Sequence, residues 1–557
     1  MGLGDRRLQP TPPPRNPPMP LSARIKYGKQ VLKWYSRGHL LGPFLPTHPI
    51  VKRCRIHPTF GVAKPDGNIR GVTNLSKTMN GECLNDVLRD GPMATVEYIK
   101  LIQLVYILSL IGPGAWIWAK DLDEGFYNVR VRQDQIHQMA FAFAGLIFIP
   151  LVLTMGLTTA PFIFTVFMWY VVSAMRLWDR SLTFLEVPKE RFEFTFFPEQ
   201  NDLIIKDNVI LVPLINFYLD DIFGFGTRDI IFRQYHMAQK VLKFLGLNAN
   251  LKKDRVPDPT NILLGVEYRA APQQICTPWC KATAYIALAN QILSGRTVKK
   301  RLLFSLTGKA RHMAVHCKPL AAFARGVEIY GFKRRDKRSP PIPWHHDIKL
   351  VKDLRRDIEF LIRAINHVAH SPVSFDWILH PARCIDFTAY TDAAGVHGGI
   401  GGFLATPTAP FFQVAWTDVP SFPSQCIQWQ EMAAILVFLR LFATQLSGKH
   451  LHLWCDNEPV VWMLIKYRAK YSRPDLQWLI REVASCLIEH AIIPWWDHIP
   501  GDDNVIADAL SRFKPFPFKH TVHCRSFTPG SDLSAEALKI LTDISIQSSR
   551  HFVYDNI

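Results

Sequence analysis

The sequence has few acidic residues for its length and no internal repeat. Its 557 residues include 47 Asp and Glu against 65 Lys and Arg, which gives a formal net charge of +18. The excess of basic residues indicates that the protein does not repel polyanions. It predicts binding to a polyanion that weakens steeply as the salt concentration rises. Charge alone leaves open a general effect on solubility or attraction to a membrane surface. The length is sufficient for several domains with large cores.

Two features of secreted proteins are lacking. Residues 1–7 contain no apolar signal core. The ten cysteines show no paired spacing of the kind that forms a disulfide framework. We therefore expect an intracellular protein, cytoplasmic or nuclear, that is not secreted.

Charge is also missing from residues 141–170, a run long enough to cross a membrane. Pro150, Gly156 and Pro161 interrupt this run, so we interpret it as a buried strand followed by a buried helix. A membrane-associated protein built around the run is the alternative, which partition into the soluble fraction would oppose. We expect no membrane partner.

Two adjacent carboxylates, Asp220 and Asp221, lie inside an apolar run, where two uncompensated charges would be costly. Such a pair is most often a solvated turn, but Asp121 ends another strand-like apolar segment. Three carboxylates on neighbouring strands could hold two Mg²⁺ ions roughly 3.5–4 Å apart for phosphoryl transfer. Because side chains alternate along a strand, the pair converges only at a hairpin tip or a bend, which Gly224 and Gly226 just beyond it would permit.

Four more acidic residues form a second ordered set. Asp392 ends a strand-like run, and the glycine-rich residues 398–404 follow as a second strand. Glu431 lies in a segment that is apolar nearly all round, which is typical of a buried helix. Asp456 ends an alternating strand, and Asp508 lies in a helical segment. Each acid alone is more often a helix cap or a surface charge, but their order of strand, helix, strand and helix favours a common site.

These patterns resemble the reverse transcriptases of retrotransposons that carry a C-terminal ribonuclease H. The segments that carry the resemblance are the Tyr218-Leu219-Asp220-Asp221 box, the segment around Asp121, and residues 60–70, 155–162, 246–253, 263–265 and 498–512. Residues 155–162 are similar to a gypsy-type box, whereas the lead-in at 110–116 is more similar to DIRS-type elements. The lineage therefore stays open between DIRS-like and gypsy-like.

The resemblance implies a role for individual residues. In the polymerase site it implies metal ligation by Asp121, Asp220 and Asp221 with Leu122 beside them, and nucleotide binding by Lys64, Arg70, Phe126, Met155, Gly156 and Lys253. Phe126 would clash with a ribonucleotide 2′-OH, and Lys64 and Arg70 would neutralise the triphosphate. The alternatives are that Phe126 is a plain core aromatic and that Lys64 and Arg70 are solvated charges on a loop. In the nuclease site the implied catalytic metal ligands are Asp392, Glu431, Asp456 and Asp508.

One position departs from the family pattern. Many ribonucleases H place a mobile His just after the Pro of the last segment, whereas Asp502 stands there in this sequence and His498 precedes Pro500. The proton-shuttling His is left unassigned.

The fold class implied by the resemblance is α+β and α/β. A right-hand polymerase with fingers, palm and thumb would be followed by a connection and a ribonuclease H-like domain. The expected boundaries are 1–47 for a flexible, Pro-rich basic arm, 48–270 for fingers and palm, 271–380 for thumb and connection, 381–515 for the ribonuclease H-like domain, and 516–557 for a C-terminal tail of unknown role.

The function implied by the resemblance is RNA-directed DNA polymerisation, a nucleotidyl transfer, followed by endonucleolytic hydrolysis of the RNA strand in the hybrid. Its cofactors would be two Mg²⁺ ions per active site, with Mn²⁺ as a substitute. Its partners would be an RNA template, a DNA primer, the RNA–DNA hybrid and dNTPs, and the oligomeric state is left open. The first alternative is a host-adopted nucleic-acid-binding protein with the same fold and no polymerisation. Telomerase-like and group II intron enzymes are not expected to carry the nuclease ending.

Overall fold

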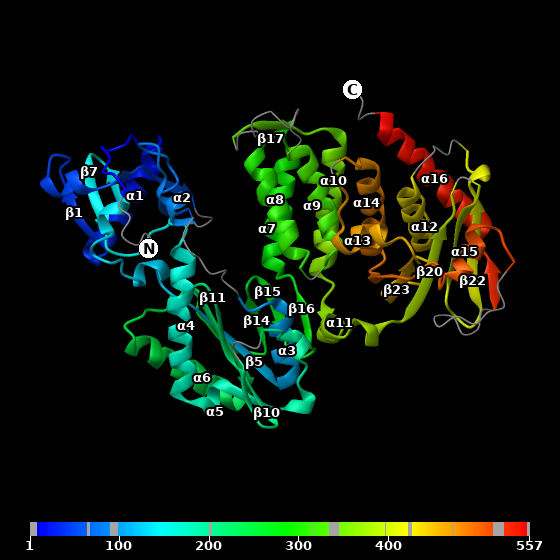
Figure 1. Cartoon of the computed structure of the whole chain (residues 1–557), viewed down its shortest axis with the longest axis horizontal. Coiled ribbons are helices and arrows are strands. Elements are labelled where there is room, and N and C mark those ends of the chain that lie inside the picture. The colour runs from blue at the N-terminus through cyan, green and yellow to red at the C-terminus, as the bar shows by residue number, and fades with distance from the viewer. Residues whose placement is uncertain are drawn as a thin grey trace. The chain divides into compact units, whose positions relative to one another are not determined.

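The computed structural model describes residues 8–63, 67–89, 98–199, 203–315, 317–332, 345–395, 397–420, 426–470, 472–515 and 528–553. It is a mixed α/β protein with several separate sheets (Figure 1). The chain divides into two compact units. Unit 1 comprises Met1–Leu264 and Arg269–Ala271, and unit 2 comprises Gly265–Tyr268 and Pro272–Ile557.

Unit 1 contains short sheets and a few long helices. Its helices are α1 (Leu21–Ser36), α2 (Leu84–Arg89), α3 (Leu101–Ile111), α4 (Ala160–Trp178), α5 (Arg180–Thr183) and α6 (Arg228–Phe244). Its strands are β1 (Leu40–Phe44), β2 (Ile56–His57), β3 (Thr59–Ala63), β4 (Ile69–Thr73), β5 (Ala115–Asp121), β6 (Ala140–Phe143), β7 (Leu146–Pro150), β8 (Phe184–Pro188), β9 (Ile204–Lys206), β10 (Val209–Pro213), β11 (Ile215–Tyr218), β12 (Asp221–Thr227), β13 (Arg255–Asp258) and β14 (Thr260–Leu263).

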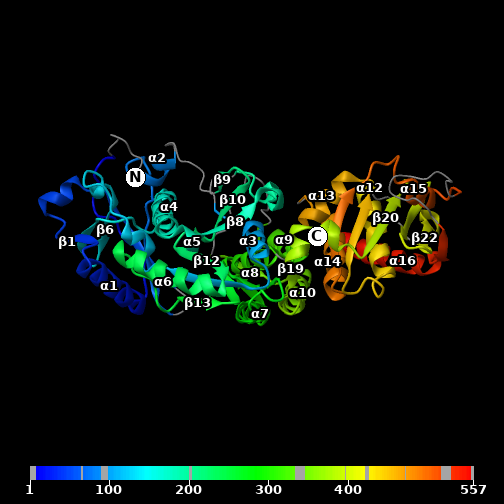
Figure 2. The same cartoon turned by 90° about the horizontal axis from the view of Figure 1, so that it is seen from below.

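The sheet that matters for function has the order β11-β12-β5-β13, with antiparallel neighbours throughout. Strands β5 and β12 are apolar on both faces because both are covered. Helices α4 and α6 pack against this sheet, and α6 runs beside β12 and β13 (Figure 2). Their buried side chains form one core with Trp118, Ile215 and Ile222 of the sheet.

The N-terminal segment differs from the expected flexible arm. Residues 21–36 form helix α1, whose Tyr27, Val31 and Trp34 are buried at helical spacing against Phe143 and Tyr127. The clustered prolines stop at Pro20, which stands at the N-cap position, so they do not prevent the helix from forming. The prediction of a flexible arm was therefore wrong for this part of residues 1–47.

The uncharged run 141–170 contains a hairpin of two buried strands, β6 and β7, followed by the start of α4. Helix α4 is buried on one face only: Phe164 and Met168 lie in the core, whereas Trp169 and Tyr170 are exposed. The prediction of a buried helix was thus only partly right. Among the described residues, α4 is the one helix long and apolar enough to cross a membrane by length and composition.

Unit 2 contains a helical part and a six-stranded sheet. Its helices are α7 (Trp279–Leu293), α8 (Lys300–Met313), α9 (Leu320–Phe332), α10 (Lys352–Ala369), α11 (Phe375–Leu379), α12 (Ile427–Leu441), α13 (Glu458–Lys466), α14 (Pro474–Glu489), α15 (Val505–Ser511) and α16 (Ser534–Val553). Its strands are β15 (Val266–Arg269), β16 (Gln274–Cys276), β17 (Thr297–Lys299), β18 (Asp347–Lys349), β19 (Val373–Ser374), β20 (Phe387–Ala393), β21 (Gly399–Leu404), β22 (Ala409–Ala415), β23 (His450–Cys455), β24 (Ile493–His498) and β25 (Pro529–Asp532).

The large sheet has the order β24-β23-β20-β21-β22-β25. Strands β20, β21 and β22 form an antiparallel meander, whereas β23 and β24 continue from β20 in parallel. Helix α12 is buried nearly all round because it packs between the sheet and helices α14 and α16. Its expected all-round burial is observed.

The helical part and the sheet of unit 2 share one apolar core. Helices α9 and α10 pack against α14, and the rings of Phe323 and Phe360 stack 4.3 Å apart. A buried ion pair joins α10 to α14, with Asp357 2.6 Å from Arg481. The core also extends past residue 515, because α16 buries Ala537, Leu541 and Ile544 and β25 pairs with β22.

Candidate active sites

Three aspartates gather at one end of the β5–β12 strand pair. Asp121 is the last residue of β5 and Asp221 the first of β12, and the two are register partners. Asp220 lies in the turn between β11 and β12, where its carbonyl accepts a hydrogen bond from the Leu122 N–H (3.0 Å). The turn is made possible by Leu219, whose φ of +53° reverses the chain. The expected hairpin tip is therefore observed at Leu219 and Asp220, whereas Gly224 and Gly226, which were expected to permit the bend, lie inside β12.

Gly224 has a different role inside β12. A Cβ at this position would lie 2.2 Å from Oε1 of Gln234 and 2.4 Å from Nε1 of Trp118. These two side chains hydrogen-bond to each other at 2.6 Å, so α6 is held to β5 across the glycine. The absence of a side chain allows this close approach, which anchors the strand that begins with Asp221.

The aspartates are arranged so that ionisation is costly without a cation. Burial, followed by the charges of Asp220 and Asp121, raises the pKa of Asp221 to about 6. Burial and Asp121 also raise the pKa of Asp220. Three close carboxylates, of which Asp121 is buried and Asp220 and Asp221 are half-buried, fit the hard oxygen-ligand chemistry of Mg²⁺, which would relieve the repulsion.

Lys253 supplies a cation to this cluster. Its Nζ lies 2.8 Å from Oδ1 of Asp121, and the side-chain amide of Asn250 donates to Oδ2 of the same carboxylate (3.3 Å). Burial lowers the pKa of Lys253, but the hydrogen bond and charge of Asp121 outweigh burial and raise it. Lys253 was expected to bind nucleotide, whereas Asn250 is a neighbour that the sequence did not point out.

A buried network holds the segment that carries Lys253. Lys120, which is 1% exposed, donates from Nζ to Oδ1 of Asp254 at 2.8 Å. The Tyr235 hydroxyl donates to the other oxygen of the same carboxylate. Because Asp254 directly follows Lys253, this network fixes the backbone from which Lys253 reaches Asp121.

Two of the expected nucleotide-binding residues lie close to Asp220. Phe126 is half-buried against Phe164 (ring centroids 5.2 Å apart), and a Cβ on the preceding Gly125 would lie 3.1 Å from Cβ of Asp220. Arg70 on β4 is exposed, and its charge lowers the pKa of Asp220 against the larger effects that raise it. Lys64 lies outside the described residues.

Met155 and Gly156 dock on the strand that carries Arg70. The carbonyl of Met155 accepts a hydrogen bond from the Thr73 N–H (3.2 Å). Gly156 has φ +109°, and a Cβ there would lie 2.1 Å from the carbonyl oxygen of Thr73. The amide of Asn85 donates to the Gly156 carbonyl (2.8 Å) and holds the loop in place. These contacts place the two residues beside β4, and Gly156 is required by the backbone there.

The second set of acids meets at one end of the unit 2 sheet. Strands β20 and β23 are parallel with Thr391 opposite Cys455, so Asp392 and Asp456 follow side by side. A side-chain hydrogen bond joins them. Glu431 on α12 and Asp392 are each 2% exposed. Asp508 on α15 is partly exposed and pairs with Arg512.

The glycine-rich strand β21 explains how α15 comes so close. A Cβ at Gly401 would lie 2.5 Å from Cβ of Leu510 and 2.6 Å from the backbone nitrogen of Ser511. Because Gly401 has no side chain, α15 can lie directly on this strand. The Ser511 hydroxyl then donates a hydrogen bond to Asp392, which ties α15 to the acid on β20.

The carboxylates of this cluster also disfavour one another's ionisation. Burial, followed by the charge of Asp456, raises the pKa of Asp392 to about 7. Burial and the charge of Asp392 raise the pKa of Glu431 well above its usual range, and burial raises that of Asp456. Buried carboxylates this close remain ionised together only with compensating cations, so the donor set fits divalent metal ions.

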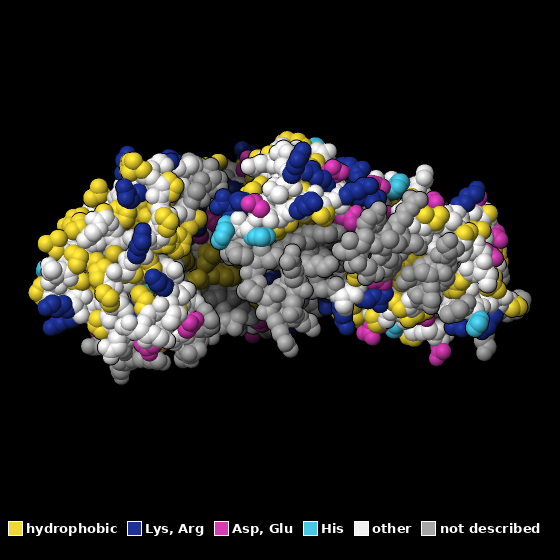
Figure 3. Space-filling model, turned by 90° about the horizontal axis from the view of Figure 1, so that it is seen from above, with side chains coloured by type: hydrophobic (Ala, Val, Ile, Leu, Met, Phe, Trp, Pro, Cys, Tyr) yellow, Lys and Arg dark blue, Asp and Glu magenta, His cyan; other side chains and the backbone are white. Residues whose placement is uncertain are grey.

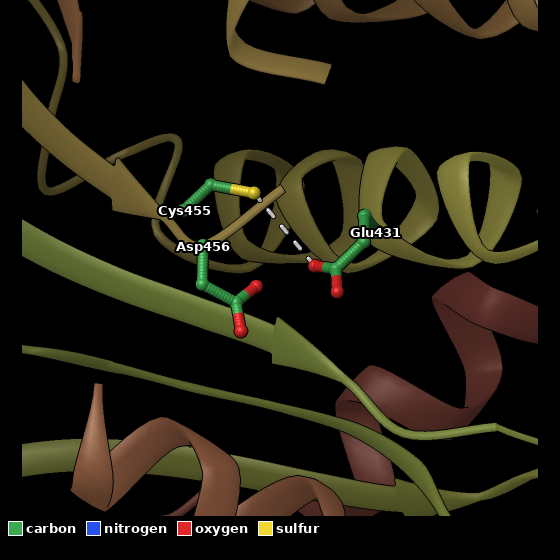
Figure 4. Close-up of side chains that lie close together, drawn as sticks. All are labelled: Glu431, Cys455 and Asp456. Atoms are coloured by element: carbon green, nitrogen blue, oxygen red, sulfur yellow. Dashed lines mark hydrogen bonds between the residues drawn. The ribbon is translucent and has the colours of Figure 1, made fainter. Parts of the chain in front are cut away.

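Two further residues adjoin this cluster. His498 ends β24, and its Nε2 lies 3.1 Å from the carbonyl oxygen of Asp456. The sequence left its role open. Cys455 is buried beside Glu431, with Sγ 3.7 Å from Oε2, as Figure 4 shows. The alternating pattern before Asp456 could have pointed to Cys455, because Leu451, Leu453 and Cys455 share the buried face of this strand.

Among known proteins, no family model and no curated sequence matches this chain. Solved structures of the foamy viral protease-reverse transcriptase are similar at low level. The dRH form in complex with double-stranded DNA has 14% identity and a TM-score of 0.44, and the match covers 89% of this chain and 73% of that chain. The complex with an RNA/DNA hybrid has 13% identity and a TM-score of 0.43, covering 90% and 78%. The native Prototype Foamy Virus protein has 13% identity and a TM-score of 0.33, covering 98% and 80%.

Proposed function

We propose that the chain is an RNA-directed DNA polymerase with a ribonuclease H in unit 2. The observation that carries the proposal is the pairing of Asp121 with Asp221 across β5 and β12, with Asp220 in the adjoining turn. A second, separate carboxylate cluster in unit 2 supports it. Two clusters of this kind on one chain suit the copying of RNA and the removal of the copied strand.

In unit 1, Asp121, Asp220 and Asp221 would hold two Mg²⁺ ions, with the Leu122 backbone beside them. When bound, the metal would polarise the primer 3′-OH and the α-phosphate and neutralise developing charge. Lys253, whose side chain is 61% exposed, would turn from Asp121 towards phosphate oxygens as the site loads. Arg70 would face the same anion, and Phe126 would lie against the sugar.

In unit 2, Asp392, Glu431, Asp456 and Asp508 would hold the metal ions that direct water at an RNA phosphodiester. Ser511 would keep Asp392 oriented through its hydrogen bond. Arg512 pairs with Asp508, and it would release this acid for metal binding by turning to solvent or to a phosphate.

A basic surface in unit 2 supports a nucleic-acid partner. The residues that form it are exposed on and beside the β17–β18 pair: Arg296, Lys299, Arg301 and Lys349. Figure 3 shows Lys and Arg side chains in dark blue where β17 and the neighbouring helices of unit 2 face the viewer. Asp347 pairs with Lys299 at 2.6 Å, and the remaining charges would contact backbone phosphates.

In this proposal β3 and β4 belong to the fingers, the β11-β12-β5-β13 sheet is the palm, and α7 to α10 form the thumb and connection. The six-stranded sheet with its helices would be the ribonuclease H domain. The chain would serve retrotransposon replication, in an element of DIRS-like or gypsy-like lineage.

Primer extension separates this proposal from an adopted nucleic-acid-binding protein. The wild-type chain is given a DNA primer annealed to RNA, dNTPs and Mg²⁺, and binding to the same hybrid is measured across a salt series. We expect Mg²⁺-dependent incorporation, with Mn²⁺ as a substitute, and salt-sensitive binding. Hybrid binding without incorporation under either metal would favour the adopted binding protein.

A further inference from the structure

Cys455 places a sulfur ligand inside the nuclease cluster. It is 1% exposed at the end of β23, and Figure 4 shows its thiol directed at Glu431 with Asp456 alongside. The ligand atoms of these three side chains all lie within 4.8 Å of one another, and no other group of three His, Cys, Asp or Glu meets this condition in the described part of the chain. Magnesium does not use sulfur ligands, so in a magnesium site this thiol would only donate its hydrogen bond to Glu431.

We propose that Glu431, Cys455 and Asp456 form a binding site for a thiophilic divalent cation such as Zn²⁺. Thiolate and carboxylate together suit Zn²⁺, which commonly takes three protein ligands and one water. The distance from Sγ to Oε2 of Glu431 is 3.7 Å. Zn–S and Zn–O bonds at a tetrahedral angle place the two ligand atoms about 3.5 Å apart, so little movement is needed.

The surroundings of the thiol suit a bound metal. The Asn457 N–H lies 3.4 Å from Sγ and would donate to the thiolate once the proton has left for solvent. A cation held there would add positive charge between Glu431 and Asp456, whose buried carboxylates otherwise repel each other. The site thus gains both a soft ligand and charge compensation.

Zinc binding at this site would interfere with the nuclease, an inference that rests on the proposed function. Glu431 and Asp456 cannot hold catalytic Mg²⁺ in its required geometry while they hold Zn²⁺ with Cys455. Zn²⁺ should therefore inhibit RNA cleavage in competition with Mg²⁺. Polymerisation in unit 1 should be far less sensitive, because Asp121, Asp220 and Asp221 have no cysteine among them.

Cobalt(II) tests the metal site without any activity, because a cobalt–thiolate bond produces a near-ultraviolet charge-transfer absorption. The full-length wild type, Cys455→Ala, Cys455→Ser and Cys486→Ala are titrated with Co²⁺ alone, and then with Zn²⁺ in competition. Cys486 is a matched control, since it is also buried in unit 2 but lies on α14 outside the ligand group. We expect the band in wild type and Cys486→Ala, its loss in both Cys455 variants, and its displacement by Zn²⁺.

The same four proteins are assayed for Mg²⁺-dependent RNA cleavage with added Zn²⁺. Loss of an outer-shell partner already costs roughly 10–100-fold in metal affinity, so loss of the sulfur ligand should raise the half-inhibitory Zn²⁺ concentration at least that much. Cleavage by Cys455→Ser without Zn²⁺ shows that the variant is folded. A cobalt band that persists in the Cys455 variants, or equal Zn²⁺ inhibition of all four proteins, would overturn the inference. If the wild type does not cleave RNA, the proposed nuclease fails, and the cobalt band still decides the metal site.

Discussion

Asp121 and Asp221 are directly opposite each other on antiparallel strands, although they are distant in the sequence. Strand β5 ends and β12 begins at the same end of the β11-β12-β5-β13 sheet, and Leu219 at φ +53° turns Asp220 into the same region. Lys253 balances part of this charge through Asp121. The three carboxylates are arranged as in a cation-binding site, and the ammonium group of Lys253 already contacts one of them.

The carboxylate cluster of Asp392, Glu431, Asp456 and Asp508 should make stability depend on pH when no metal is present. The pKa of Asp392 is raised to about 7, so between the ordinary value of 3.8 and about 7 the folded protein binds more protons than the unfolded chain. The free energy of unfolding should therefore fall as pH rises through this window. Asp392→Asn should remove the effect and stabilise the protein at pH 8 by on the order of 2 kcal/mol.

Denaturant unfolding in EDTA at pH 5 and pH 8 measures this difference. Asp418→Asn serves as the control because Asp418 is exposed and outside the cluster. Adding Mg²⁺ should stabilise the wild type at pH 8 more than Asp392→Asn, because the metal binds only the folded cluster. Equal pH profiles for wild type and Asp392→Asn would show that the acids do not repel one another in the folded protein.

Phe126 should select against ribonucleotides. It packs on Phe164 beside Asp220, where the sugar of an incoming nucleotide would lie. Phe126→Ala should raise the ratio of ribonucleotide to deoxynucleotide incorporation by roughly 10–200-fold, the discrimination that a steric pocket provides. The measurement is kcat/KM for each nucleotide, and Phe167→Ala on α4 is a control that removes a neighbouring aromatic of the same core. An unchanged ratio would leave Phe126 as a core aromatic.

The buried pair of Asp357 and Arg481 should hold α10 to α14. Removing one partner leaves a buried charge alone, so Arg481→Ala should cost about 3–5 kcal/mol. The double variant Asp357→Leu with Arg481→Met should recover much of the loss. The exposed pair of Lys299 and Asp347 provides the control, since Lys299→Ala should cost about 0–1 kcal/mol. Thermal unfolding of these variants checks this, and a small cost for Arg481→Ala would show that the two helices are not coupled.

The basic surface should set part of the salt dependence of binding. Neutralising Arg296, Arg301 and Lys349 together should weaken hybrid binding irrespective of sequence. It should also reduce the slope of log K against log salt by about 1 for each phosphate that the protein no longer neutralises. The control replaces exposed Lys240 and Lys243 on α6. If both sets lower the slope equally, the charge acts only through the net charge of the chain.

Several local features followed from sequence pattern. The apolar periodicity around Glu431 predicted a buried helix, and the alternation before Asp456 predicted a strand that ends at the acid. Residues 399–404 form the strand expected from the glycine-rich run. These features depend on short-range periodicity, which a single sequence displays.

Other features depend on tertiary packing and are not visible in a local pattern. The contact of Lys253 with Asp121 needs β13 to pair with β5, and the contact of Asp357 with Arg481 needs α10 to pack on α14. Helix α1 was hidden by the prolines before it, and α16 follows a strand of only four residues with no apolar alternation. The role of Leu219 was missed because leucine rarely adopts a positive φ.

Crossed variants separate the two proposed active sites. Asp220→Asn, Glu431→Gln and the nearby control Asp123→Asn are compared with wild type on one RNA template with a DNA primer, with extension and RNA loss followed in the same reaction. Loss of a metal ligand worth several kcal/mol should lower the affected rate by roughly 10²–10³-fold or more. We expect Asp220→Asn to abolish extension and keep cleavage of a preformed hybrid, Glu431→Gln to do the reverse, and Asp123→Asn to keep both activities. Loss of both activities in either variant that still folds, or retention of extension by Asp220→Asn, would contradict the proposal of two separate sites.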